Sequence, residues 1–216
     1  KMKQLLITIA AVVLVGCGYK AERALHTAAK RGNTDAVRKA IEDGLNVDTI
    51  GYEGRTPLHE AAFAGHKDTV AFLVSKGADV DAMDILSYTP MHLAAAGGHK
   101  DTVAFLASKG ANINARDRVI ETQSTGVVPI VNERWTPLHI ASSQGRIDVV
   151  EFLISQGAEV NTMDNDGETP LDWTKITNEF DTLEDKERKA RNCPKIAELL
   201  RKHGGKTGEE LKAAGN

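Results

Sequence analysis

The sequence predicts an all-α solenoid, a stack of two-helix units joined by short β-hairpin turns. Three observations lead to this fold class. Tetrapeptides that begin with Thr-Pro recur with spacings of 33, 47 and 33 residues, each one opens a stretch with helical apolar spacing, and glycines follow at repeated offsets. The tetrapeptides are Thr56-Pro57-Leu58-His59, Thr89-Pro90-Met91-His92, Thr136-Pro137-Leu138-His139 and Thr169-Pro170-Leu171-Asp172.

The second unit shows why each repeat forms two helices. Thr56 can cap a helix with its hydroxyl, and Pro57 suits the first helical position because its missing N–H is not needed there. The first helix ends near Gly65, a second begins near Lys67, and Gly77 supplies a left-handed cap. One unit cannot bury its apolar stripe alone, so the units must stack.

These residues resemble the ankyrin repeat, whose 33-residue unit carries the signature T-P-L-H-x-A. The resemblance covers about residues 20–205, including a degenerate first copy, and implies an ankyrin-repeat solenoid. It also implies a non-catalytic protein-binding scaffold, so we expect no cofactor. We assign residues 22–50, 51–83, 84–116, 135–163 and 164–205 to five repeats, and residues 206–216 to a C-terminal tail.

An insertion of 14 residues separates the third and fourth repeats, and we place it within residues 117–134. Two β-branched runs flank a Gln-Ser-Thr-Gly turn, which predicts an extended hairpin. Ile120 and Val128 lie in these runs. The apolar residues of the two runs cannot all face the solenoid, so some should be exposed, and we expect a partner to contact them. Internal packing and a flexible loop are the alternatives.

A second insertion of 14 residues, around 180–192, carries both signs of charge inside the last repeat. Thr182 and Asp185 form a capping box, which predicts an extra short helix before Pro194 restarts the repeat helix. A polar terminal cap is the simplest role for this segment. The same capping signal predicts a last small helix over Thr207, Glu210 and Leu211.

Residues 1–16 have the pattern of a secretory signal peptide. Two lysines precede an apolar run of eleven residues, which reaches about 16 Å and is too short for a bilayer core of about 30 Å. The run ends in Leu14-Val15-Gly16-Cys17, which resembles a bacterial lipobox. This resemblance implies lipidation of Cys17, a lipidated linker over residues 17–21, and a place in the bacterial cell envelope. A cleaved signal with an incidental Cys17 is the alternative.

Catalytic and metal sites find no support in the motifs. Asp164 to Glu168 lacks the ligand spacing of a calcium loop and is interpreted as an acidic turn. No phosphate loop or nucleophile elbow occurs. The seven histidines all have a repeat position that explains them: His26, His59, His92 and His139 share one, His66 and His99 share another, and His203 ends the last unit.

The candidate partner-binding residues are those at the turn tips and first helices, which line the groove in ankyrin proteins. Tyr, Trp and Arg are the side chains most enriched at binding hot spots. Packing of Trp173 under the second insertion, with tyrosines that only shield turns, is the alternative. One row is Arg55, Tyr88, Trp135 and Glu168, a second is Glu60, Leu93, Ile140 and Trp173, and Tyr52 and Phe63 complete the set.

The net charge of the chain limits the classes of partner that it can bind. With 27 Lys+Arg against 30 Asp+Glu the net charge is −3, and no basic run occurs, which argues against nucleic acid. We therefore expect a protein partner, with membrane contact through the lipid. A self-associating structural protein, and hence a homo-oligomer, is the second possibility. An envelope enzyme is the third, but no unexplained pair of base and nucleophile supports it.

Overall fold

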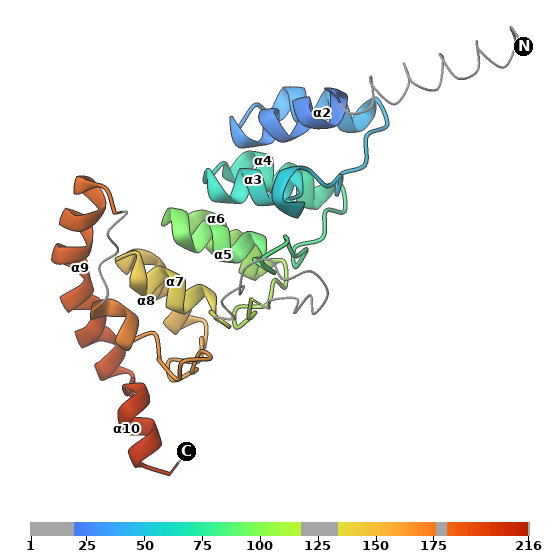
Figure 1. Cartoon of the computed structure of the whole chain (residues 1–216). Coiled ribbons are helices and arrows are strands. Elements are labelled where there is room, and N and C mark those ends of the chain that lie inside the picture. Colours follow the sequence, from blue (N-terminus) through green and yellow to red (C-terminus); the bar gives the residue numbers. More distant parts are fainter. Residues whose placement is uncertain (1–19, 118–133, 176–180, 216) are drawn as a thin grey trace, which may run out of the picture.

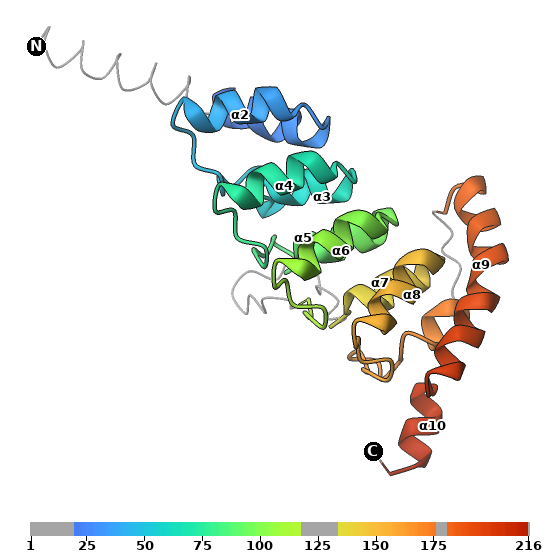
Figure 2. The ribbon, with the colours of Figure 1, turned by 180° about the vertical axis from the view of Figure 1, so that it is seen from behind.

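The computed structural model describes residues 20–117, 134–175 and 181–215, and every regular element in these ranges is a helix. The helices stack in one row from the N-terminal to the C-terminal end (Figure 1), and the reverse view shows the same order (Figure 2). The predicted all-α solenoid is confirmed. Its elements are a helix over 20–30, α2 (Thr34–Glu42), η1 (Tyr52–Gly54), α3 (Pro57–Phe63), α4 (Lys67–Ser75), α5 (Pro90–Gly97), α6 (Lys100–Ser108), α7 (Pro137–Ser143), α8 (Ile147–Ser155), η2 (Asp172–Lys175), α9 (Leu183–Lys202) and α10 (Gly208–Ala213).

The Thr-Pro tetrapeptides start the first helices as predicted. Thr56 is the N-cap of α3, and its backbone N–H donates to Nδ1 of His59 at 3.1 Å. The same bond measures 3.1 Å at Thr89 and 3.2 Å at Thr136. In the fifth repeat an aspartate takes the histidine position and accepts from Thr169 N–H at 3.0 Å, but the first helix shrinks to the 3-10 segment η2.

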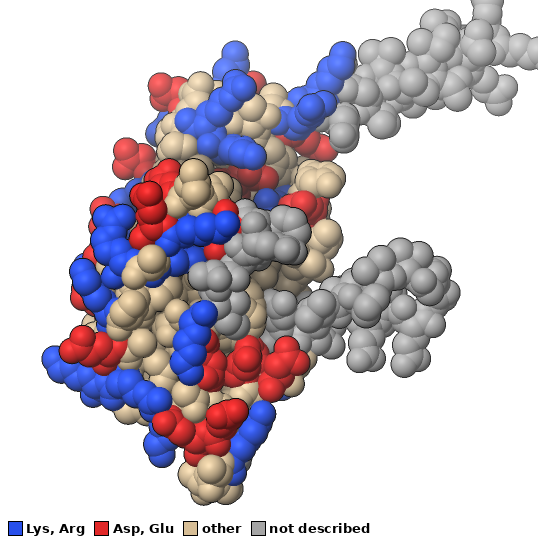
Figure 3. Space-filling view, turned by 60° about the vertical axis from the view of Figure 1, so that its left-hand side comes forward, with Lys and Arg blue, Asp and Glu red and all other residues tan. Residues whose placement is uncertain are grey.

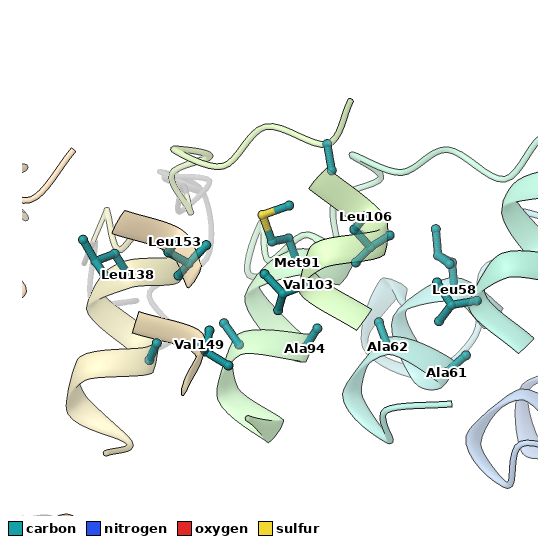
Figure 4. Packing of buried hydrophobic residues seen from close by; sticks show 14 of the residues in the cluster. Leu58, Ala61, Ala62, Met91, Ala94, Val103, Leu106, Leu138, Val149 and Leu153 are labelled. Atoms are coloured by element: carbon teal, nitrogen blue, oxygen red, sulfur yellow. The ribbon is translucent and has the colours of Figure 1, made fainter. Parts of the chain in front are cut away.

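Packing joins equivalent helices of successive repeats in two layers. α3 packs on α5 and α5 on α7, while α4 packs on α6 and α6 on α8. Leu58, Met91 and Leu138 occupy one repeat position and are fully buried, each contributing roughly 1.5–3 kcal/mol (Figure 4). Alanines such as Ala61 and Ala94 let the first helices approach closely, which explains why the repeat favours them.

A ladder of side-chain hydrogen bonds links the bases of successive turns. In each of the first four repeats one Asp or Asn accepts the backbone N–H of a residue further along the stack, which lies in the next repeat or, for the last bond, in the C-terminal tail. The bonds are Asp48 to Asp79 N–H at 3.2 Å, Asp81 to Asn112 N–H at 2.9 Å, Asn114 to Glu159 N–H at 3.0 Å and Asn161 to Lys206 N–H at 2.8 Å.

The C-terminal cap differs from the prediction. The capping box of Thr182 with Asp185 is confirmed, but α9 runs unbroken through Pro194, so the expected separate short helix is wrong. The reason is packing on both sides of the proline: Asn192 donates to the Gly145 carbonyl at 2.9 Å, and Ile196 is buried in the core. The predicted last small helix is present as α10.

Three predictions lie outside the described residues: the signal peptide of residues 1–16, the lipidated Cys17, and the first insertion with Ile120 and Val128. Within the described ranges, no helix combines the length and apolarity that a bilayer crossing requires.

Candidate functional site

The turns between repeats and the first helices that follow them form the candidate surface. Each turn is closed by one backbone hydrogen bond, and the predicted β-hairpins are reduced to this single bond in the described residues. The row of Arg55, Tyr88, Trp135 and Glu168 forms the returning arm of the turns. The closing bonds are Gly51 N–H to Arg55 O at 2.8 Å, Asp84 to Tyr88 at 3.0 Å, Asp117 to Trp135 at 3.1 Å and Asp164 to Glu168 at 2.9 Å.

Buried histidines position this row from the repeat before it. His59 Nε2 lies 2.9 Å from the Tyr88 carbonyl oxygen, and His92 Nε2 lies 3.1 Å from that of Trp135. Since Nδ1 already accepts the threonine N–H, the neutral ring with its proton on Nε2 fits both bonds. Burial lowers the pKa of His59, and it lowers the pKa of His92 to about 4.

Arg55 and Tyr88 of the first predicted row make contacts within the protein itself. The Arg55 guanidinium lies 3.1 Å from a Glu53 oxygen, and its Nε donates to Asp84 at 3.5 Å. The Tyr88 ring is half-buried, 5.6 Å from the His92 ring. These side chains therefore hold neighbouring turns together as well as lining the surface.

The second predicted row lies deeper than expected. Leu93 is 5% exposed and Ile140 is 6% exposed, so both lie beneath the surface and we remove them from the candidate surface. Glu60 is half-buried and stays on it. Such burial could not be read from repeat position alone, because it depends on how neighbouring turns fold over the first helices.

Trp135 and Trp173 belong to different predicted rows, and the structure brings them together. Their rings meet edge to face with centroids 4.3 Å apart. The Trp173 indole N–H donates to Asp164 at 2.8 Å, and the same carboxylate accepts the backbone N–H groups of Asp166 and Glu168. The half-buried tryptophans thus stiffen the turn between the last two repeats. The acidic turn expected here is confirmed.

The most open part of the surface lies at the first two repeats. Tyr52 is 86% exposed and Phe63 is 44% exposed. Tyr52 borders a hollow of about 590 Å³ between the helix 20–30 and the turn before α3, which we call the entry hollow. Glu60 also borders it, and Phe63 lies three residues further along the same face of α3. The other lining residues are Glu22, Arg23, His26, Thr27, Lys30, Ile50 and Gly51.

Four further exposed apolar residues on the turns escaped the sequence analysis: Ile50, Met83, Ile85 and Leu86. Repeat position carried the signal, because Ile50 and Met83 are equivalent, as are Tyr52 and Ile85. Sorting only the aromatic residues missed them. We call Ile50, Tyr52, Met83, Ile85 and Leu86 the turn-tip patch.

Comparison with protein families settles what this stack of units is. The family "Ankyrin repeats (3 copies)" matches residues 3–84 and 120–184, and the family "Ankyrin repeat" matches residues 87–118. The chain belongs to the ankyrin repeat family. A search of curated proteins finds no match.

Ankyrin repeats are typically non-catalytic modules for protein interaction. Among the described residues, no group of three or more His, Cys, Asp and Glu side chains could hold a metal ion. The ankyrin histidines bond to backbone groups, as with His66 Nε2, 3.1 Å from the Lys30 carbonyl oxygen, and His99 Nε2, 3.0 Å from that of Phe63. Basic and acidic side chains are interspersed on the face seen in Figure 3.

Proposed function

We propose that this ankyrin solenoid binds a protein partner along the turns and first helices, centred on the entry hollow, while a lipid on Cys17 holds it in the bacterial envelope. The observation that carries the binding proposal is the exposure of Tyr52, which borders that hollow, and of Phe63, which follows Glu60 by three residues on α3. Large exposed aromatic side chains around a concave site are typical of binding hot spots.

The chemistry of the entry hollow suggests the kind of contact. Tyr52 offers an apolar ring with a polar tip, and Arg23, Lys30 and Glu60 place charges of both signs around it. A partner segment with an apolar anchor and polar flanks fits this lining. Successive repeats are tied by buried histidines and by the turn ladder, so the surface is already ordered before a partner arrives and less entropy is lost on binding.

Two matched variants test partner binding. Phe63→Ser removes an exposed anchor near the hollow, and Leu183→Ser removes a residue that is also exposed but lies at the start of α9. We expect Phe63→Ser to lower the affinity for a captured envelope protein by about tenfold, since one hot-spot contact is worth more than about 1 kcal/mol. Leu183→Ser should bind normally, and both variants should unfold at the wild-type urea concentration.

Equal capture by wild type and Phe63→Ser would contradict the groove proposal. Equal weakening by both variants would do so as well, because it would point to nonspecific apolar contact.

The anchoring proposal rests on the likeness of Leu14-Val15-Gly16-Cys17 to a lipobox. A chain with two or more acyl groups stays on a membrane almost permanently, whereas one chain binds only marginally. We expect labelled palmitate to enter the wild type and not Cys17→Ser. The Cys193→Ser variant is the control, because that buried thiol should take up no label. Equal labelling of wild type and Cys17→Ser would refute the proposal.

A further inference from the structure

The turn-tip patch gathers most of the exposed apolar side chains that the structure describes. Seven large hydrophobic residues are exposed in the described ranges, and five of them lie on two neighbouring turns. Tyr52 is the most exposed, and Ile85 is 61% exposed. The Ile85 N–H donates to the Glu53 carbonyl at 3.0 Å, so the two turns are fixed to each other and present one continuous patch.

The charges next to Ile85 and Leu86 in this patch are paired with one another. The Asp84 carboxylate accepts the N–H groups of Leu86 and Tyr88 at 2.9 and 3.0 Å, and its side chain is almost completely buried. Arg55 bridges Asp84 and Glu53. The charges next to Ile85 and Leu86 are therefore already neutralised, which favours an apolar surface over a charged partner at this part of the patch.

The patch lies at the same end of the stack as the start of the described chain. The first helix of the described chain begins on the side where the turns lie, as both views show (Figures 1 and 2). The entry hollow agrees, since Glu22 and Arg23 border it together with Ile50 and Tyr52. Cys17 is three residues before Lys20, and three residues span at most about 11 Å.

We propose that the turn-tip patch rests on the lipid surface to which Cys17 is anchored; this rests on the proposed lipidation. A tether of at most about 11 Å holds Lys20 within about one helix diameter of the bilayer, so no folded domain fits between the start of the helix 20–30 and the lipid. Tyr52 suits the headgroup level because its ring is apolar and its hydroxyl polar. The lipid surface, not a protein, therefore covers Met83, Ile85 and Leu86. Ile50 and Tyr52 border the entry hollow and lie at the edge of the lipid, so the hollow and the first helices remain open to a partner.

The test is a depth measurement on the lipidated full chain in vesicles that contain brominated lipid. A fluorescent label is attached at Ile85→Cys, or at Lys100→Cys as the matched control, in a Cys193→Ser background. Lys100 is exposed and opens α6 at the end away from the turns. Acylation uses the Cys17 sulfur, so the label reaches only the introduced cysteine. Mass analysis of the N-terminal peptide reports the anchor independently.

With the anchor present, we expect the label at position 85 to shift to the blue and lose most of its emission to the brominated lipid, while the label at 100 keeps its emission. A lipidated chain whose label at 85 stays as bright as that at 100 overturns this inference and leaves the anchoring proposal intact. Shielding of position 85 by a bound protein, without quenching by lipid, also overturns it. An unmodified Cys17 overturns the anchoring proposal and this inference together.

Discussion

Lowering the pH from 7 to 5 should destabilise the solenoid through its buried histidines. Burial lowers the pKa of His92 and of His139 to about 4 each, against 6.5 for an exposed histidine. In His92, Nδ1 accepts a hydrogen bond from the Thr89 N–H at 3.1 Å. A protonated Nδ1 could not accept this bond, so the fold disfavours the charged ring. The unfolded chain therefore binds protons first, and stability is lost as the pH falls from about 6.5 towards 4.

The magnitude follows from these pKa values. At pH 5 an unfolded histidine with a pKa of 6.5 gains about 2 kcal/mol from protonation, and a folded one with a pKa near 4 gains almost nothing. His92 and His139 together should remove about 4 kcal/mol, a large share of the 5–15 kcal/mol of a typical domain. The lowered pKa values of His26, His59 and His99 act in the same direction.

Urea denaturation at pH 7, 6 and 5 measures the effect. We expect the free energy of unfolding to fall at each step, and His92→Gln to lose about 2 kcal/mol less than the wild type between pH 7 and 5 because it lacks one titrating ring. Asp185 and Glu210 do not interfere, because their folded pKa values are lowered to about 2 by hydrogen bonds and ion pairs and the unfolded carboxyls also titrate below pH 5. A free energy of unfolding that is constant or rises between pH 7 and 5 would refute the reasoning.

Urea denaturation of four variants tests the packing. Lys189→Met should lower the free energy of unfolding by about 3 kcal/mol. The lysine is 4% exposed and pairs with Asp181 at 2.8 Å, so its removal leaves that carboxylate without a compensating charge. A loss below about 1 kcal/mol would contradict this account. Asp84→Ala should cost about 2 kcal/mol, since two turn N–H groups lose their acceptor, and unchanged stability would refute the turn account. Gly65→Ala should destabilise by more than Gly77→Ala: both have positive φ, but only at Gly65 would a Cβ meet the His99 ring. Equal losses would show that this contact carries no energy.

Most of the fold could be predicted because the same helix-starting residues recur in several repeats. Thr56, Pro57 and His59 act within one helical turn, so their effect does not depend on distant packing. The course of α9 could not be predicted in this way. A proline inside a helix normally ends or kinks it. At Pro194, contacts with the preceding repeat, such as that of Asn192 with Gly145, keep α9 continuous.

The candidate surface was only partly predictable for the same reason. Repeat position places Leu93 and Tyr52 on the same side of the solenoid, but exposure depends on how each turn covers its neighbour, and one is buried while the other is open. The pairing of Trp135 with Trp173 joins residues of different rows, which a row-by-row comparison cannot find. The turn-tip patch could have been predicted from the sequence, since Ile85 occupies the same repeat position as Tyr52.

Photocross-linking in intact cells tests the central claim most directly, namely that the entry hollow and α3 bind a protein. A photoreactive phenylalanine analogue replaces Phe63. The same analogue at Leu183 is the control, because that position is more exposed, at 81% against 44% for Phe63, but lies on α9. We predict a discrete adduct of one added protein from position 63 and none from position 183. No adduct from position 63, or the same set of adducts from both positions, would contradict the claim.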